Sequence, residues 1–210
     1  MRTAKGIIVA AMATCIIAWS LPLGAQSIRG HELLGLRVGG VIAGGAFADK
    51  FGNGSEIDLH FIHGITSALG VDVSISSHNF GESKDREKNQ EFFGRTEMNL
   101  QIFSVTAGMI VLKPLHGRVT ATAEAGPGLY SINAILPLGF YEAQKTDNHL
   151  GLYGGVGVLV KIANSVSLNA NGKYHTVFVG TGSGDTVHSF TQDNQARFFQ
   201  IAFGVMISTR

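Results

Sequence analysis

Apolar and polar residues alternate along most of this 210-residue chain. The pattern is clearest from Arg118 to Tyr130, where the polar positions carry Glu124, two threonines and two glycines. The intervening positions are Val119, Ala121, Ala123, Ala125, Pro127 and Leu129. Successive side chains on a strand point to opposite faces, so the stretch predicts a strand with one apolar face. That face would meet a core in a soluble sheet, or lipid in a membrane barrel whose polar face lines the lumen.

Eight segments between about residues 33 and 209 show this alternation, and the connections between them alternate in length. The short connections are 64–67, 113–117 and 163–165, and the long ones are 46–55, 80–96, 131–148 and 179–196. An even strand number with short turns at one end and long loops at the other is typical of transmembrane barrels. We therefore predict an all-β fold, an eight-stranded antiparallel up-and-down transmembrane β-barrel with its short turns toward the periplasm.

Two local patterns add detail to this prediction. From Phe103 both faces of the segment 97–112 become apolar or small, which predicts a β-bulge near Ile102 and Phe103 or a strand buried in a soluble sheet. Aromatic residues gather near the predicted strand ends, which predicts girdles at the two membrane interfaces. They are Phe47, Phe51, Phe80, Phe92, Phe93, Tyr130, Phe140, Tyr141, Phe178, Phe190, Phe198 and Phe199. Packing within the loops is also expected of them.

The first residues predict a secretory signal. Arg2 and Lys5 precede an apolar run that ends near Trp19, and Ala25 offers a small residue at a cleavage site. The run is short for a transmembrane helix, although a retained anchor helix is the alternative. We predict a cleaved signal peptide over residues 1–25 and one barrel domain over residues 26–210.

Composition narrows the class of protein. Charged residues make up 15% of the chain, against about 25% in ordinary globular proteins, and the 28 glycines are roughly twice the usual share of about 7%. Cys15 lies within the signal, so no disulfide framework is expected. Loss of Arg2 and Lys5 changes the formal net charge from +1 to −1, which leaves no basic surface for nucleic acid.

Charged residues at the polar positions form the candidate site. In a narrow barrel they converge on the lumen, where buried charges need partners. We expect a lumen charge network, with His60 as a further candidate member. Its residues are Arg37, Asp58, Asp72, Glu97, Glu124, Lys173 and His175. The network would act as a plug that holds the barrel together, or as a gated ion path whose pairs rearrange. Eight strands leave an interior that side chains just fill, which favours the plug.

No chemical site is expected. None of the eight histidines has a compact metal-ligand spacing, and His60 and His63 fall on opposite faces of a strand. The neighbours His175–Thr176 and His188–Ser189 pair a base with a nucleophile, but adjacent strand residues also point apart. Gly154–Gly155 indicates close backbone approach and not a phosphate loop. We predict no enzyme activity, no catalytic residues, no metal and no cofactor.

The stretch Gly117–Tyr130 resembles the small bacterial outer-membrane β-barrel domain family, which includes the OmpA transmembrane domain and OmpX-type proteins. Gly151–Val158 and Lys173–Tyr174 fit the same loose pattern, and the resemblance covers residues 33–209. It implies a location in the outer membrane of a Gram-negative-type bacterium. The partners it implies are outer-membrane lipids and lipopolysaccharide, with the barrel-assembly machinery and periplasmic chaperones during biogenesis. The sequence names no external partner.

These observations lead to an expected function and to alternatives. We expect an integral envelope protein with a filled lumen and a structural or surface-interaction role carried by its long loops. The first alternative is a narrow gated channel for ions or small solutes. A lipid-modifying outer-membrane enzyme and a soluble periplasmic β-sandwich are the others.

Overall fold

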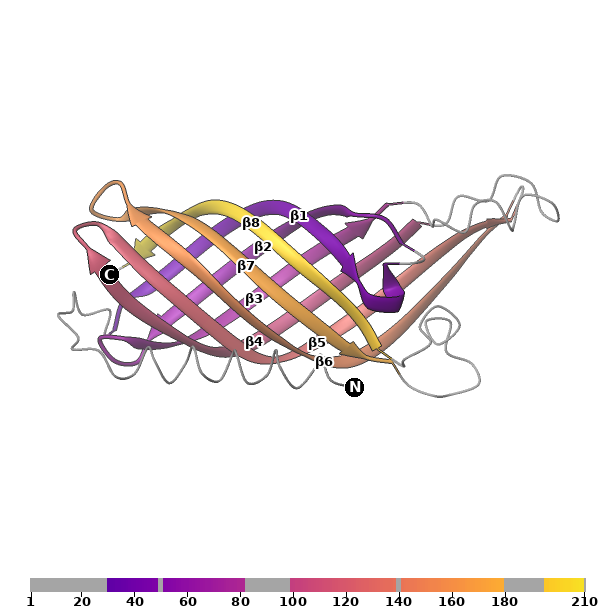
Figure 1. The fold of residues 1–210 in the computed structure, drawn as a ribbon, viewed down its shortest axis with the longest axis horizontal. Coiled ribbons are helices and arrows are strands. Elements are labelled where there is room, and N and C mark those ends of the chain that lie inside the picture. The colour runs from indigo at the N-terminus through magenta and orange to yellow at the C-terminus, as the bar shows by residue number, and fades with distance from the viewer. Residues whose placement is uncertain (1–29, 49–50, 82–98, 139–140, 180–194, 210) are drawn as a thin grey trace.

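The computed structural model describes residues 30–48, 51–81, 99–138, 141–179 and 195–209. This part of the chain forms eight antiparallel strands that close into one barrel in sequence order (Figure 1). The strands are β1 (Glu32–Gly44), β2 (Gly54–Gly64), β3 (Leu69–Phe80), β4 (Asn99–His116), β5 (Val119–Leu138), β6 (Tyr141–Lys161), β7 (Val166–Phe178) and β8 (Gln195–Thr209). The predicted eight-stranded barrel is confirmed, whereas the predicted signal peptide lies outside the described residues.

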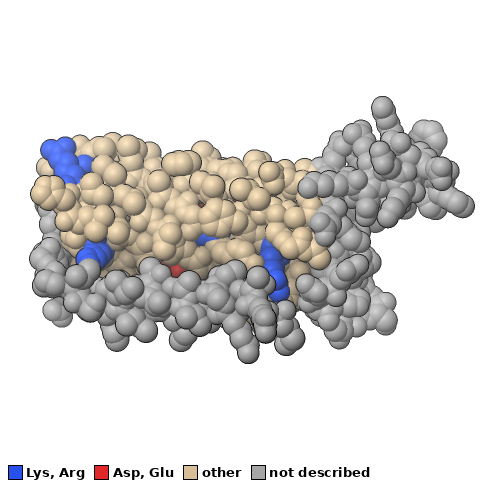
Figure 2. Space-filling view, viewed as in Figure 1, with Lys and Arg blue, Asp and Glu red and all other residues tan. Residues whose placement is uncertain are grey.

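Each strand sends apolar side chains outward and polar or large side chains inward. On β1, Leu36 and Val38 are 54% and 56% exposed, whereas Arg37 between them is 1% exposed. The same alternation of exposed and buried positions runs through β2 and β3. Figure 2 shows the result on one face, where the described surface over the strands is largely uncharged.

Closure of the barrel comes from pairing between the first and last strands. β1 pairs with β8 from Glu32↔Thr209 to Gly44↔Arg197. Because every strand has two neighbours within the barrel wall, the wall leaves no edge to pair with another chain. The backbone polar groups of the strands are satisfied within the barrel, which is the condition for a strand to cross lipid.

Three short turns lie at the same end of the barrel, as predicted. They connect β2 to β3, β4 to β5 and β6 to β7. In the β4–β5 turn Gly117 has φ of 57°, a left-handed conformation that costs little only for glycine. A 3-10 turn η1 (Gly45–Phe47) follows β1 in the connection to β2. No helix within the described ranges is long and apolar enough to cross a membrane.

The predicted bulge near Ile102 and Phe103 is wrong. β3 and β4 pair without a break from Leu69↔Val111 to Phe80↔Leu100, so the phase of β4 never changes. Leu100 and Ile102 are apolar but point into the lumen. Apolar residues at inward positions give the sequence pattern of a strand whose inward and outward faces exchange, although β4 does not change face. The register of β4 on β5 shifts instead between Pro114 and His116, where proline has no N–H to donate.

The predicted long loop 131–148 is also wrong, because most of it continues β5 and β6. The two strands stay paired to Leu138↔Tyr141, beyond the last described pairing of β5 with β4 at Ile135↔Asn99. The β5–β6 hairpin therefore projects past the other strands at the long-loop end (Figure 1). Pro137 lies beyond the last described pairing of β5 with β4, so it interrupts no described ladder hydrogen bond on that side.

Candidate functional site

The lumen holds six of the seven residues predicted for the charge network. All six are buried, and they are Arg37, Asp58, Asp72, Glu124, Lys173 and His175. Glu97 lies outside the described residues. The six do not form a single chain of ion pairs but fall into separate groups at different heights in the barrel.

Arg37 and Asp58 form the first group. They are direct partners across β1 and β2. The Arg37 guanidinium donates to Asp58 Oδ2 from Nε at 2.8 Å and also from Nη2. On its other side Arg37 faces Gly204 of β8, where an added Cβ would lie 2.7 Å from Arg37 Cγ. The glycine therefore makes the space in which the arginine side chain lies.

Glu124 and Lys173 form the second group, with a glycine between them. Glu124, Gly155 and Lys173 are neighbours in register on β5, β6 and β7. Lys173 reaches across the glycine and places Nζ 3.2 Å from Glu124 Oε2. A Cβ at Gly155 would lie 2.8 Å from Lys173 Cγ. Asn171 Nδ2 donates to the other carboxylate oxygen, Glu124 Oε1, at 3.2 Å.

Asp72 is held by Tyr153, a residue that the sequence placed at a polar position without assigning it a role. The Tyr153 hydroxyl lies 3.0 and 2.9 Å from the two carboxylate oxygens of Asp72 and donates to them. Gly108 faces Asp72 across the strands, and a Cβ there would lie 2.5 Å from the Tyr153 hydroxyl. An inward tyrosine is thus accommodated by an inward glycine.

His60 lies between the two carboxylates just described. Its Nε2 is 3.6 Å from Asp72 Oδ2 and 3.8 Å from Glu124 Oε2. The His60 residue is 1% exposed, and neither ring nitrogen has a hydrogen-bond partner among the described residues. The sequence suggested His60 as a further member of the network, and the structure brings it to both acidic groups.

A second polar layer lies closer to the long-loop end. His175 Nε2 donates a hydrogen bond to Gln200 Oε1, and the Tyr130 hydroxyl is hydrogen-bonded to His175 Nδ1, both at 2.9 Å. Its ring stacks on Phe198 with centroids 4.6 Å apart. His175 is therefore held by neutral and aromatic groups, apart from the ion pairs.

The same layer contains three residues that sequence spacing did not single out. His78 Nε2 is hydrogen-bonded to Ser104 Oγ at 3.2 Å, and His78 Nδ1 lies 3.2 Å from Glu56 Oε2. All three are buried. They occupy inward positions of β2, β3 and β4, so only the register of the three strands brings them together.

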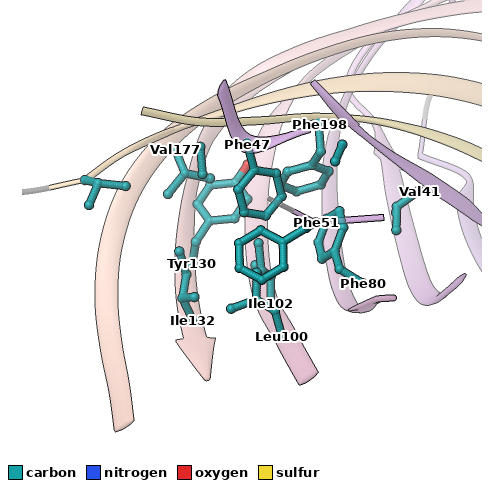
Figure 3. Close-up of a cluster of buried hydrophobic side chains, with 13 residues drawn as sticks. Val41, Phe47, Phe51, Phe80, Leu100, Ile102, Tyr130, Ile132, Val177 and Phe198 are labelled. Atoms are coloured by element: carbon teal, nitrogen blue, oxygen red, sulfur yellow. The ribbon is translucent and has the colours of Figure 1, made fainter. Parts of the chain in front are cut away.

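Apolar clusters close the lumen on both sides of these polar layers. At the long-loop end, Phe47 packs on Phe51 and Phe80 with ring centroids 4.8 and 5.1 Å apart (Figure 3). The long-loop cluster consists of Val41, Ala43, Phe47, Phe51, Phe80, Leu100, Ile102, Tyr130, Ile132, Val177, Val179, Ala196 and Phe198. The short-turn cluster consists of Ile62, Ile110, Leu112, Leu159 and Met206.

The long-loop cluster overturns part of the predicted aromatic girdle. Five of the residues assigned to it lie inside the barrel instead: Phe47, Phe51, Phe80, Tyr130 and Phe198. Three of them occupy inward strand positions, and the other two belong to the β1–β2 connection, which folds inward. Phe178 and Phe199 do face outward, whereas Phe92, Phe93, Phe140, Phe190 and the Tyr141 side chain lie outside the described residues.

A cavity of about 550 Å³ opens at the short-turn end. Leu112 and Leu159 of the short-turn cluster belong to its lining. The remaining wall carries hydroxyl groups and the basic side chains of Arg118 and Lys161. The cavity is therefore open at the short-turn end and closed on its inner side by apolar side chains of the short-turn cluster.

Solved structures with a similar architecture include outer-membrane proteins of bacteria. The outer membrane protein OprG of Pseudomonas aeruginosa aligns with a TM-score of 0.58 at 10% identity, over 90% of this chain and all of that one. Neisserial surface protein A aligns with a TM-score of 0.56 at 15% identity, over 85% of this chain and 96% of that one. Ail, the attachment invasion locus protein of Yersinia pestis, aligns with a TM-score of 0.54 at 13% identity, over 86% of this chain and 99% of that one.

The chain has the fold of the small outer-membrane β-barrels. The likeness holds over almost the whole length of each relative, so the barrel is the complete shared unit. No protein-family model and no curated protein sequence matches this chain. At identities of 10 to 15% the comparison speaks for architecture, and the lumen residues must be interpreted from their own geometry.

Proposed function

We propose that this protein is an integral outer-membrane β-barrel with a filled lumen and a structural or surface-interaction role in the envelope. The observation that carries the proposal is its outer surface. Leucine, isoleucine, valine and phenylalanine side chains are exposed on all eight strands. Soluble monomers rarely expose contiguous apolar patches larger than a few hundred Å², whereas a band of this kind is what lipid requires.

The location and the partners follow from this surface and from the expected export signal. Lipids of the outer membrane, including lipopolysaccharide in its outer leaflet, would contact the apolar band. The barrel-assembly machinery and periplasmic chaperones would handle the chain before insertion. The short turns would face the periplasm, and the β5–β6 hairpin would then project outside the cell.

The surface-interaction part of the role rests on the β5–β6 hairpin. β6 pairs with β7 only from Leu150↔Phe178 onward, so the preceding residues of β6 are paired with β5 alone in the described structure. No described strand pairs with the outer edges of this projection, and an extended segment of a partner can bind such edges through backbone hydrogen bonds.

The filled lumen favours this role over the narrow channel. A conducting path would have to cross the short-turn cluster, two polar layers and the long-loop cluster, all made of buried side chains. We expect purified protein in planar bilayers to give no reproducible conductance steps, while a known porin in the same bilayers does. Reproducible steps that Phe47→Ala or Phe80→Ala enlarges would establish the channel instead.

One group of side chains has the composition of the catalytic machinery of an ester hydrolase, but its burial argues against that function. Ser104, His78 and Glu56 follow the order of nucleophile, base and acid, with the distances given above. Catalysis needs a substrate within reach of the nucleophile, but Ser104 is 0% exposed, below the long-loop cluster. We therefore expect no labelling of Ser104 by a fluorophosphonate. Labelling that disappears in Ser104→Ala would establish the hydrolase.

A further inference from the structure

The lumen contains a compact set of groups able to ligate a metal ion. His60 of β2, Asp72 of β3 and Glu124 of β5 each offer one ligand atom, and these atoms all lie within 4.8 Å of one another. It is the one such group of three found in the described part of the chain. Each side chain is buried, so the cluster is an interior feature and not a patch of surface acids.

His60 points to a missing partner. Its Nε2 lies 3.6 Å from Asp72 and 3.8 Å from Glu124, too far for a hydrogen bond to either. Both ring nitrogens are buried, and within the described ranges neither has a hydrogen-bond partner. A buried polar group in this condition is costly, and a metal ion between the three ligand atoms would remove the cost for Nε2.

The two carboxylates are held in position by neighbouring side chains. Tyr153 donates to Asp72, and Asn171 donates to Glu124 Oε1, which leaves Oε2 on the side of His60. Metal ligands in proteins are commonly oriented by such a second layer of hydrogen bonds. The orientation of both acids toward one histidine is therefore already built into the barrel.

We propose that His60, Asp72 and Glu124 bind a zinc ion that ties β2, β3 and β5 together. One imidazole nitrogen with two carboxylate oxygens is a ligand set that zinc accepts, at about 2.0–2.2 Å from each atom. Tetrahedral ligands at that distance are roughly 3.3 Å apart. The separations of 3.6 and 3.8 Å from His60 would shorten by a few tenths of an ångström, and the separation between the two carboxylates, which is at most 4.8 Å, by up to about 1.5 Å. Calcium and magnesium prefer sites made of oxygen alone.

Local charge also favours a divalent cation. Asp72 and Glu124 together carry two negative charges, and the ammonium of Lys173, 3.2 Å from Glu124 Oε2, offsets one of them. Arg37 is already paired with Asp58. A zinc ion would therefore enter a region with an excess of negative charge, at the cost of competing with Lys173 for one oxygen.

The test is zinc binding by the purified full-length barrel in detergent micelles after treatment with a chelator. Zinc is added to the folded protein in one sample and is present during refolding in another, because the apolar clusters restrict access. We expect one zinc ion per chain, measured by calorimetry and by metal analysis after dialysis. Cobalt bound at the same site should give the visible absorption of tetrahedral coordination.

Three variants locate the ion. His60→Gln and Glu124→Gln should each weaken zinc binding by about tenfold or more, whereas His63→Gln should leave it unchanged, since His63 is half-exposed beside Glu32 at the short-turn end. A folded barrel migrates differently on a gel before and after boiling, so this comparison shows which variants fold. If His60→Gln does not fold, Glu124→Gln tests the site in its place. Absence of bound zinc by both loading routes would overturn the proposal. Zinc retained by the two lumen variants, or lost in His63→Gln, would overturn it as well.

Discussion

Glycines at inward positions decide where the large side chains of the lumen lie. Arg37 lies over Gly204, Lys173 over Gly155 and the Tyr153 hydroxyl over Gly108. In each case an added Cβ would come within 3.0 Å of the large side chain. A barrel of eight strands has room for such side chains only where the facing position has none.

The glycine pair of β6 allows this idea to be tested with a matched control. In Gly155→Ala the new Cβ would meet Lys173 Cγ and a backbone oxygen at 2.8 Å, whereas in Gly154→Ala its nearest neighbour is at 3.8 Å. We expect Gly155→Ala to lower the free energy of unfolding by about 1–3 kcal/mol through overpacking. Gly154→Ala should stay within about 0.5 kcal/mol. Urea unfolding of the refolded barrel measures both, and equal losses would contradict the account.

The Arg37–Asp58 pair gives a second test at the level of residues. Asp58→Ala leaves a buried guanidinium without its partner, which costs about 3–5 kcal/mol. The apolar double variant Arg37→Met with Asp58→Leu should recover much of that loss, because removal of both charges leaves none unpaired. Glu32→Ala is the control, since its pair with His63 is half-exposed and worth about 0–1 kcal/mol. The same urea titrations apply, and a small loss in Asp58→Ala would show that Arg37 has another partner.

The positions of the strands are the feature of this protein that the sequence pattern predicts best. The alternation of apolar and polar positions located all eight strands, the three short turns and the outward face of every strand except β4, where Leu100 and Ile102 point inward. It failed where pairing outweighs local preference: β5 and β6 keep their ladder to Leu138↔Tyr141 through residues rich in turn formers. It failed again for inward aromatic residues such as Phe80 and Phe198, because a lumen can be apolar at its ends.

The β5–β6 hairpin should be separable from the barrel. Asn133 and Thr146 are paired in register, and the Thr146 hydroxyl donates to Asn133 Oδ1 at 2.5 Å. Replacing residues 134–145 by Asn-Gly would close the strands with a type I′ turn. We expect the shortened protein to fold with an unchanged shift in gel mobility between unboiled and boiled samples. Loss of that shift would mean that the hairpin is needed to form the barrel.

A charged residue introduced on the outer face of a strand should cost more folding free energy the deeper it lies in the bilayer. Val156 is 57% exposed and pairs with Gly172 in the middle of β7, and Leu115 is equally exposed at the short-turn end. Val156→Lys should cost about 2–4 kcal/mol in lipid vesicles, and Leu115→Lys about 0–1 kcal/mol. Folding titrations in vesicles measure both variants. Equal costs would indicate that the middle of the outer surface does not lie in the middle of a bilayer.

At the scale of the whole molecule, register and closure create the arrangements that spacing along the chain does not reveal. Inward positions of the charged residues follow from alternation, and six of the seven predicted residues lie in the lumen. Their partners do not follow, because contacts such as Tyr153 with Asp72, or His60 with Glu124, join strands far apart in sequence. They depend on strand order and on the heights at which the barrel aligns its strands.

The central claim is that this chain is a closed barrel in the outer membrane with its apolar band in lipid. The most direct measurement separates the membranes of cells that produce the protein and compares unboiled with boiled samples on a gel. The account predicts that the protein is in the outer-membrane fraction and that its mobility changes only after boiling, when the barrel unfolds. A protein found in the periplasmic fraction without detergent, with the same mobility in both samples, would contradict it.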